Sequence, residues 1–321
     1  MAVYTEISDE DLDGLLDQYD IGQALSCKGI AEGVENSNYL LHTEKGFYIL
    51  TLYEKRVHKE DLPFFLGLMQ HLASSGFMSP KPIQAKNGEF LQEAADRPAA
   101  IIEFLDGRSV KRASPQHCGL LGSALAQLHT AGSDFKLTRK NTLSIESWRP
   151  LFEGCQSGNP DELTPQLLLE IESELQYLEK NWPSDLPSGV IHADLFPDNI
   201  FFLNDNVSGV IDYYFACNDF FAFDLAICLN AWCFETDGSF NITKARKLLN
   251  GYRSIRPFSK EELSYLPLLC RGASIRFFLT RLYDWLNQVD GALVKPKDPF
   301  EYLKKSQFHR LVETVSAYGL D

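Results

Sequence analysis

The sequence predicts an α+β fold, with an N-terminal lobe built on an antiparallel β-sheet and a larger helical lobe after it. The chain has 321 residues, and 45% of them are hydrophobic, which is enough to bury the cores of two lobes. Strand-like runs separated by turns dominate as far as Gly107, whereas helix start signals dominate beyond it. We therefore expect a β-rich lobe over residues 1–103 and a helical lobe over residues 104–321.

The first lobe is predicted to open with a short amphipathic helix and to continue as a sheet. Ser8 and Asp11 resemble a helix-capping pair, and leucines recur at helical spacing after them. Apolar runs joined by short polar turns then predict two consecutive hairpins, which indicate antiparallel pairing. The three strands of these hairpins are expected at residues 24–28, 39–42 and 47–53.

The remaining elements of this lobe are predicted from glycine and other turn residues that mark where helices and strands end. A helix is expected over residues 59–75, because its apolar pattern stops at Gly76. The pair Asn87-Gly88 predicts another hairpin, since this dipeptide favours the tight turn that joins two strands. The apolar run over residues 99–104 predicts a buried strand.

The second lobe is predicted to be mostly helical. Ser114-Pro115 and Thr164-Pro165 each place a capping residue before a proline, which predicts helices over residues 115–131 and 165–181. A capping box at Ser259 predicts a further helix near the end of the chain. Short strands are expected among these helices, at residues 190–192, 200–203 and 207–212.

The charge and cysteine content restrict the class of protein. Lys and Arg number 30 against 44 Asp and Glu, and the net charge of −14 disfavours binding to nucleic acid or to an anionic membrane surface. Seven scattered cysteines without a C-x-x-C pair indicate neither a disulfide framework nor a zinc site. We see no secretion signal and no membrane-spanning run, so we expect a cytoplasmic protein.

The short strands carry the residues that indicate chemistry. His192, Asp194 and Asn199 form the pattern H-x-D-x-x-x-x-N, and Ile211-Asp212 follows the next hairpin. This arrangement resembles the protein-kinase-like phosphotransferases, in particular the aminoglycoside and choline kinase branch. The resemblance implies ATP and Mg²⁺ as cofactors. It implies Asp194 as the residue that deprotonates the acceptor hydroxyl, Asn199 and Asp212 as metal ligands, and a supporting role for His192.

The resemblance extends to segments on either side of this motif. The segment 101–107 looks like the family's hinge, where main-chain groups of Glu103 and Leu105 would pair with adenine. The turn before the second strand would face the phosphates, and its expected contacts are Gly33, Asn36, Ser37 and Asn38. Asp224 matches an aspartate that caps a helix in relatives and fixes the catalytic loop.

Two residues of the family pattern are missing. Thr51 stands where a strand lysine of the family touches the phosphates, and the following helix lacks the glutamate that pairs with that lysine. Losing both members of an ion pair leaves no buried orphan charge. We keep Thr51 among the expected nucleotide contacts. The departure also leaves open a pseudokinase that binds nucleotide without catalysis.

Over residues 4–315 the chain resembles the bacterial homoserine kinases of this fold, which have the same departure at Thr51. The resemblance implies L-homoserine as the acceptor. Choline, ethanolamine, a sugar or an aminoglycoside remain alternative acceptors. A cation should bind the substrate carboxylate and oxygen atoms its ammonium group. The candidates are Arg139, Asp198, Tyr213, Arg276 and Arg281. The sequence does not predict the oligomeric state.

Overall fold

The computed structural model describes residues 5–30, 36–54, 57–157, 163–287 and 296–320. Contacts divide the chain into two compact units. The sheet unit comprises Met1–Arg108, Asp134–Arg139 and Ile200–Tyr214. The helical unit comprises Ser109–Ser133, Lys140–Asn199 and Phe215–Asp321. Each unit therefore contains segments that are far apart in the sequence.

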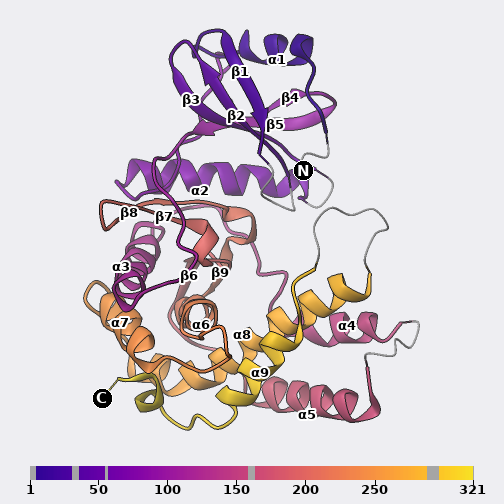
Figure 1. Cartoon of the computed structure of the whole chain (residues 1–321), viewed down its shortest axis with the longest axis vertical. Coiled ribbons are helices and arrows are strands. Elements are labelled where there is room, and N and C mark those ends of the chain that lie inside the picture. The colour runs from indigo at the N-terminus through magenta and orange to yellow at the C-terminus, as the bar shows by residue number, and fades with distance from the viewer. Residues whose placement is uncertain (1–4, 31–35, 55–56, 158–162, 288–295, 321) are drawn as a thin grey trace. The chain divides into compact units, whose positions relative to one another are not determined.

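The sheet unit is built on a five-stranded antiparallel sheet (Figure 1). Its spatial order is β1-β2-β3-β5-β4, so the two predicted hairpins are confirmed. Strand β2 alternates between buried and more exposed positions along its whole length, as expected for a sheet that buries one face, whereas the last three residues of β3 are all buried. The strands are β1 (Ala24–Gly29), β2 (Ser37–Thr43), β3 (Gly46–Leu52), β4 (Gln92–Ala94) and β5 (Arg97–Glu103).

Helix α1 (Asp9–Leu16) covers part of this sheet. The Ser8 side chain accepts a hydrogen bond from the main-chain N–H of Asp11, which confirms the predicted cap. Leucines from the apolar side of α1 belong to the same buried cluster as residues of β2, β3 and β5. Burial of that side holds the short helix in place, since eight residues form too few internal hydrogen bonds to be stable alone.

The hairpin predicted at Asn87-Gly88 is wrong. These residues do form a turn, with Gly88 at a φ of +88°, but no strands flank it. The hairpin instead joins β4 to β5 through Ala95 and Asp96, whose φ values are +50° and +58°. Two non-glycine residues with positive φ give the turn the twist that a two-residue hairpin needs. Asn-Gly favours such a turn more strongly than Ala-Asp does. The strands that pair with each other, however, lie on either side of Ala95 and Asp96.

Two more elements complete the description of the sheet unit. Helix α2 (Leu62–Ser74) follows a 3₁₀ turn (Lys59–Asp61) and stops before Gly76, whose φ is +78°, as predicted. Strands β7 (Ile200–Leu203) and β8 (Asn206–Val210) form a separate two-stranded hairpin. Asn204 and Asp205, both with positive φ, form its turn. The end of β8 leads directly to Asp212.

The helical unit confirms the three predicted helix starts. Helices α3 (Pro115–Ala131) and α5 (Pro165–Asn181) begin at the prolines, and Ser259 forms a capping box at the start of α8 (Lys260–Leu286). Helix α3 packs closely on α7 (Ile242–Arg253; Figure 1), because glycines at the contact let the two backbones approach. The other elements are α4 (Ile145–Cys155), β6 (Ser188–Ile191), β9 (Cys217–Phe220), α6 (Phe221–Trp232) and α9 (Phe300–His309).

Strand β6 pairs with β9, and this pair positions the loop that follows β6. Helix α6 starts at the residue after β9 and is buried along almost its whole length. Both ends of the loop between β6 and β7 are therefore attached to ordered strands. Among the described residues, no helix combines the length and the apolar character needed to cross a membrane.

Candidate active site

The loop between β6 and β7 contains the predicted catalytic motif. Asp194 is partly buried, and its main-chain carbonyl accepts hydrogen bonds from the N–H of Phe196 and from Asn199 Nδ2, each at 2.8 Å. Asn199 Nδ2 also lies 3.4 Å from Asp194 Oδ2. Asn199 is thus held against Asp194 within the helical unit, as the pattern H-x-D-x-x-x-x-N predicts.

The orientation of the Asn199 amide fits a metal ligand. Its nitrogen is directed at Asp194, so its carbonyl oxygen Oδ1 is directed away from that residue. A carbonyl oxygen is a hard ligand of the kind that Mg²⁺ prefers. The other predicted ligand, Asp212, belongs to the sheet unit and has a φ of +67°. Both residues therefore have the donor chemistry that a magnesium site needs.

Asp224 binds the main chain of the catalytic loop. Its two carboxylate oxygens accept hydrogen bonds from the main-chain N–H groups of His192 and Ala193, at 2.8 and 2.9 Å. Burial alone would raise the pKa of Asp224, but its hydrogen bonds with His129 and with the main-chain N–H of His192 hold that pKa below its ordinary value. The expected role in fixing the loop agrees with these contacts.

The helix-capping role expected for Asp224 is wrong. The residue before α6 is Phe220, whose side chain makes no capping hydrogen bond, and Asp224 lies inside the first turn of the helix. Its side chain is directed at the loop instead of at the N–H groups of its own helix. The carboxylate binds two buried N–H groups there, which would otherwise have lacked partners.

A buried chain of hydrogen bonds continues from Asp224 through His129. His129 Nε2 lies 3.1 Å from Asp224 Oδ2, and its Nδ1 lies 2.7 Å from the hydroxyl of Tyr252. Burial lowers the pKa of His129, so the neutral ring donates through Nε2 to Asp224 and accepts the Tyr252 hydroxyl at Nδ1. His129 is therefore a buried hydrogen-bonding residue of α3.

Arg276 lies beside the same loop. Its side chain is buried, and Nη1 donates a 2.7 Å hydrogen bond to the main-chain carbonyl of Ala193. The guanidinium also lies over the rings of Phe277 and Phe215, at 4.1 and 5.6 Å. Burial lowers the pKa of Arg276, and the negative charge of Asp194 opposes that shift. Arg276, one of the residues predicted to bind the substrate, is thus hydrogen-bonded to the catalytic loop.

Arg281 lies further along α8, in a cluster with residues of α9. It pairs with Glu301 Oε2 at 2.9 Å and lies over the ring of Tyr302 at 4.3 Å. Lys305 pairs with the other oxygen of Glu301 and lies on the same ring at 4.1 Å. Burial lowers the pKa of Lys305, which Glu301 opposes. Two cations therefore share one carboxylate here.

Thr51 lies buried at the position of the missing lysine. Its hydroxyl donates a 2.8 Å hydrogen bond to Asn38 Oδ1, its cross-strand partner. Tyr214 also hydrogen-bonds Thr51 and lies edge-on to Tyr53. Burial, with the charge of Asp212, raises the pKa of Tyr214 to about 12. A neutral hydroxyl cluster thus replaces the expected charge.

The helix that lacks the glutamate is apolar at this point. Phe65 of α2 is buried, and its ring lies edge-on to Tyr214 at 5.7 Å. The lysine and the glutamate of the family pattern are both missing, and aromatic side chains pack closely around Thr51 instead.

The side chains expected at the phosphates are engaged within the sheet unit. Ser37 Oγ donates to Glu54 Oε1 at 2.7 Å, and Asn36 Oδ1 accepts from the main-chain N–H of Glu54 at 3.2 Å. Arg97 Nε pairs with Glu54 Oε2 at 3.1 Å. These contacts fix the start of β2, and the pair of Glu54 with Arg97 was not predicted. Gly33 lies outside the described residues.

The expected hinge residues follow the last sheet strand. The main-chain N–H of Glu103 donates to the carbonyl of Lys81 at 2.9 Å, which makes that N–H part of the sheet. Leu105 lies two residues beyond the end of β5 and is partly buried. The carbonyl of Glu103 and the N–H of Leu105 are thus the groups of suitable type for adenine.

The three remaining candidates differ in their surroundings. Tyr213 is buried in the sheet unit, and this burial raises the pKa of its hydroxyl. Arg139, also in the sheet unit, pairs with Asp61 at 2.7 Å and lies over Phe65. Asp198 is exposed in the 3₁₀ turn of the catalytic loop.

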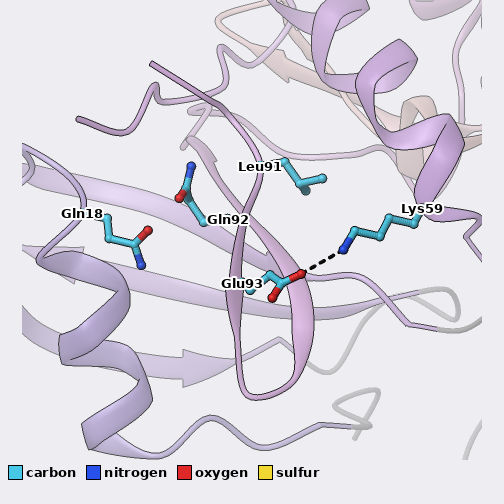
Figure 2. A pocket seen from close by; sticks show the side chains of 5 residues that line it. All are labelled: Gln18, Lys59, Leu91, Gln92 and Glu93. Carbon is cyan, nitrogen blue, oxygen red and sulfur yellow. Dashed lines mark hydrogen bonds and ion pairs between the residues drawn. The ribbon is translucent and has the colours of Figure 1, made fainter. Parts of the chain in front are cut away.

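A shallow hollow of about 360 Å³ lies elsewhere on the sheet unit, near α1 and β4 (Figure 2). Lys59 and Glu93 form an exposed 2.9 Å ion pair at its edge. Such an exposed pair contributes little to stability, because water and salt screen it. None of the predicted site residues that the structure describes lines this hollow, whose lining residues are Gln18, Lys59, Leu91, Gln92 and Glu93.

Comparison with known proteins shows the family of the chain. A model described as the phosphotransferase enzyme family matches residues 26–258. The homoserine kinase of Parvibaculum lavamentivorans is 61% identical over 321 residues, covering 100% of both chains. That of Rhodospirillum rubrum is 58% identical over 320 residues, covering 100% of this chain and 99% of the relative. The structure of an amicoumacin kinase in complex with AMP-PNP and Ca²⁺ has a TM-score of 0.70 at 18% identity, covering 93% of this chain and 91% of the other.

The chain therefore belongs to the phosphotransferase enzyme family, a class with a protein-kinase-like fold whose members transfer a phosphoryl group to a hydroxyl. Within that class it belongs to the homoserine kinases, because full-length relatives with this name share about three fifths of its residues. Thr51 therefore replaces the lysine in a chain that belongs to a family of enzymes.

Proposed function

We propose that this protein transfers the γ-phosphoryl group of ATP to the side-chain hydroxyl of L-homoserine, which gives O-phospho-L-homoserine for threonine biosynthesis. The observation that carries the proposal is the loop between β6 and β7. In it Asn199 hydrogen-bonds Asp194, and Asp224 accepts hydrogen bonds from the two residues before Asp194. The full-length identity to homoserine kinases supports the choice of acceptor. The reaction takes place in the cytoplasm under this proposal.

Asp194 accepts the proton of the homoserine hydroxyl as the oxygen attacks the γ-phosphorus. A carboxylate in this role mainly orients the hydroxyl, because phosphoryl transfer depends largely on positioning and charge stabilisation. Asp224 and His129 serve this step indirectly, since their hydrogen bonds keep the loop in one conformation. Removal of Asp194 should therefore affect turnover more than nucleotide binding.

Asn199 and Asp212 would hold Mg²⁺, as their donor atoms allow. The metal supplies positive charge that neutralises the phosphate oxygens of ATP. Asn199 contributes its carbonyl oxygen because its nitrogen is bonded to Asp194. Asp212 contributes a carboxylate from the end of the β7–β8 hairpin.

The nucleotide binds to the lobe of residues 1–103 in this proposal, whereas residues 104–321 carry catalysis and the acceptor. The carbonyl of Glu103 and the N–H of Leu105 would pair with adenine. The turn containing Gly33, together with Asn36, Ser37 and Asn38, would contact the phosphates through main-chain N–H groups, since the side chains of Asn36 and Ser37 bind Glu54. Thr51 shapes this contact through Asn38.

Arg281 is our choice for the homoserine carboxylate. It belongs to the same unit as Asp194, and it lies over the buried ring of Tyr302. That ring packs against Phe277, which contacts Phe196 of the catalytic loop. Its present partner Glu301 is half exposed, so an incoming carboxylate can take the place of that side chain. Asp198 and Tyr213 are retained as candidates for the substrate ammonium group and Arg139 as a second cation.

An ADP-release assay with purified protein, ATP, Mg²⁺ and a panel of hydroxyl metabolites tests the function. We expect homoserine to be preferred over choline, ethanolamine, sugars and aminoglycosides. Asp194→Asn should lower kcat by roughly 10²–10⁴-fold while ATP still binds. The control Asp205→Asn changes an exposed turn residue with positive φ that asparagine tolerates, so its kcat should equal the wild-type value. Release of ADP with another acceptor only, or with none, would contradict the proposal.

A further inference from the structure

The backbone at Ala193 is held by two buried side chains of opposite charge. Its N–H donates to Asp224 Oδ1 at 2.9 Å, and its carbonyl accepts from Arg276 Nη1 at 2.7 Å. Ala193 lies directly before Asp194 and has a φ of +62°. Both polar groups of this residue are therefore fixed in the conformation that sets the direction of the next side chain.

The conformation of Ala193 needs such support. A positive φ is unfavourable for an L-residue with a Cβ atom, because Cβ crowds the following carbonyl. The loop would relax to negative φ if nothing opposed it, and that change would rotate the peptide that leads into Asp194. Asp224 secures only the N–H side of this residue. The carbonyl side is secured by Arg276.

The position of Arg276 suits it to this task. It is 3% exposed, in the middle of the 27-residue helix α8. Phe277 and Phe215 lie against the guanidinium, so the side chain has little freedom to leave the loop. A buried charge without its partner is costly, which means that the hydrogen bond to the Ala193 carbonyl also stabilises the arginine itself.

We propose that Arg276 is a positioning residue, which holds the Ala193 carbonyl and thereby aims the Asp194 carboxylate at the acceptor hydroxyl. The catalytic part of this inference rests on the proposed function. It assigns Arg276 to the catalytic loop and leaves the substrate carboxylate to another cation. Misplacement of a catalytic group by about 1 Å can cost on the order of 10²-fold in rate.

Steady-state kinetics of Arg276→Met and Arg276→Lys test the catalytic part. We expect kcat to fall about 10²-fold in Arg276→Met, with the KM values for homoserine and ATP within about threefold of wild type. Arg276→Lys keeps one possible donor for the carbonyl and should recover at least about tenfold of the loss. A KM for homoserine raised about tenfold or more with kcat intact would overturn the proposal, because it would show that Arg276 binds the substrate.

The matched control is Arg271→Met on the same helix. Arg271 pairs with Glu174 and lies over Tyr177, so its removal should lower stability without changing kcat of the folded enzyme. Circular dichroism at the assay temperature establishes that each variant is folded. An equal loss of kcat in Arg271→Met would show a general effect of α8 and would count against the specific role of Arg276.

Coupling between positions 276 and 193 tests whether the arginine acts through the loop. Glycine adopts positive φ without strain, so Ala193→Gly needs less support from Arg276. We expect the loss caused by Arg276→Met to be at least about threefold smaller in the Ala193→Gly background. Equal losses in the two backgrounds would contradict action through Ala193.

Amide hydrogen exchange separates this inference from the proposed function, because it needs no acceptor. The N–H of Ala193 should exchange faster in Arg276→Met than in wild type, whereas Arg271→Met should match wild type at that position. An unchanged loop in Arg276→Met would overturn the positioning role even if homoserine is the substrate. Faster exchange in an enzyme that prefers another acceptor would support the role and reject only the substrate.

Discussion

Thr51 shows how one residue replaces a charged pair without leaving a buried defect. Its hydroxyl donates to Asn38 Oδ1, and Phe65 with Tyr214 fills the neighbouring space. The sequence reveals the absence of the lysine and the glutamate. It does not reveal what fills their place, because the partners come from β2, α2 and the segment after β8.

Thr51→Val should destabilise the protein. Valine keeps the shape but removes the donor, which leaves the Asn38 oxygen without that hydrogen bond. We expect a loss of about 1–3 kcal/mol in the free energy of unfolding, measured by urea denaturation. Thr130→Val is the control, since Thr130 bonds only the carbonyl one turn earlier in α3. A loss no larger than that of the control would exclude the proposed contact.

Arg281→Met tests the choice made for the substrate carboxylate. We expect the KM for homoserine to rise about tenfold or more with a smaller change in kcat, because the guanidinium would bind substrate and transition state alike. Arg149→Met is the control, since Arg149 pairs with Glu172 and Glu179 on α5. An unchanged KM in Arg281→Met would direct attention to Arg139.

Helices α5, α8 and α9 are joined around one buried carboxylate. Glu174 of α5 is 2% exposed, and it pairs with Arg271 of α8 and with Arg310, the residue that follows α9. The starts of α5 and α8 were predicted from their capping residues. Their joint use of one glutamate depends on how the three helices pack, which no local pattern encodes.

Glu174→Gln should be among the more destabilising single changes in the helical unit. It leaves two arginines beside a neutral side chain, and breaking a buried pair in this way typically costs about 3–5 kcal/mol. Glu179→Gln, whose partner Arg149 is about one third exposed, should cost less than about 1 kcal/mol. Thermal unfolding of the two variants measures the difference, and similar values would show that the buried network contributes little.

Strand pairing in the helical unit was the less predictable feature at the scale of elements. The runs that became β6, β7 and β8 were recognised from their apolar residues. The partner of β6 is β9, whose sequence Cys217–Phe220 contains polar residues and lacks an alternating pattern. Pairing there brings α6, and with it Asp224, to the catalytic loop.

At the scale of the whole molecule, buried histidines make stability depend on pH. His309 is buried with Nε2 near Asn230 Oδ1 and Nδ1 near the Tyr318 hydroxyl, and burial lowers its pKa to about 3. His129 shifts in the same direction. The unfolded chain therefore binds protons below about pH 6.5 that the folded protein does not bind.

The free energy of unfolding should fall as the pH drops below about 6.5. The unfolded state takes up more protons in that range, so each such histidine contributes up to about 1.4 kcal/mol per pH unit of lost stability. Urea unfolding between pH 5 and 7 measures the slope. His309→Gln removes the titrating group and should flatten that slope. A slope unchanged by the substitution would show that His309 does not titrate as the structure implies.

The residues alone specify the two-lobe class, the helix starts at Ser8, Pro115 and Pro165, and the motif containing Asp194 and Asn199. These features depend on periodicity, capping and short-range spacing, which are local properties of the chain. Tertiary packing decided the hairpin at Ala95-Asp96, the filling around Thr51 and the contact of Arg276 with Ala193. Each of these depends on partners distant in sequence, so the three-dimensional fold was needed to bring them together.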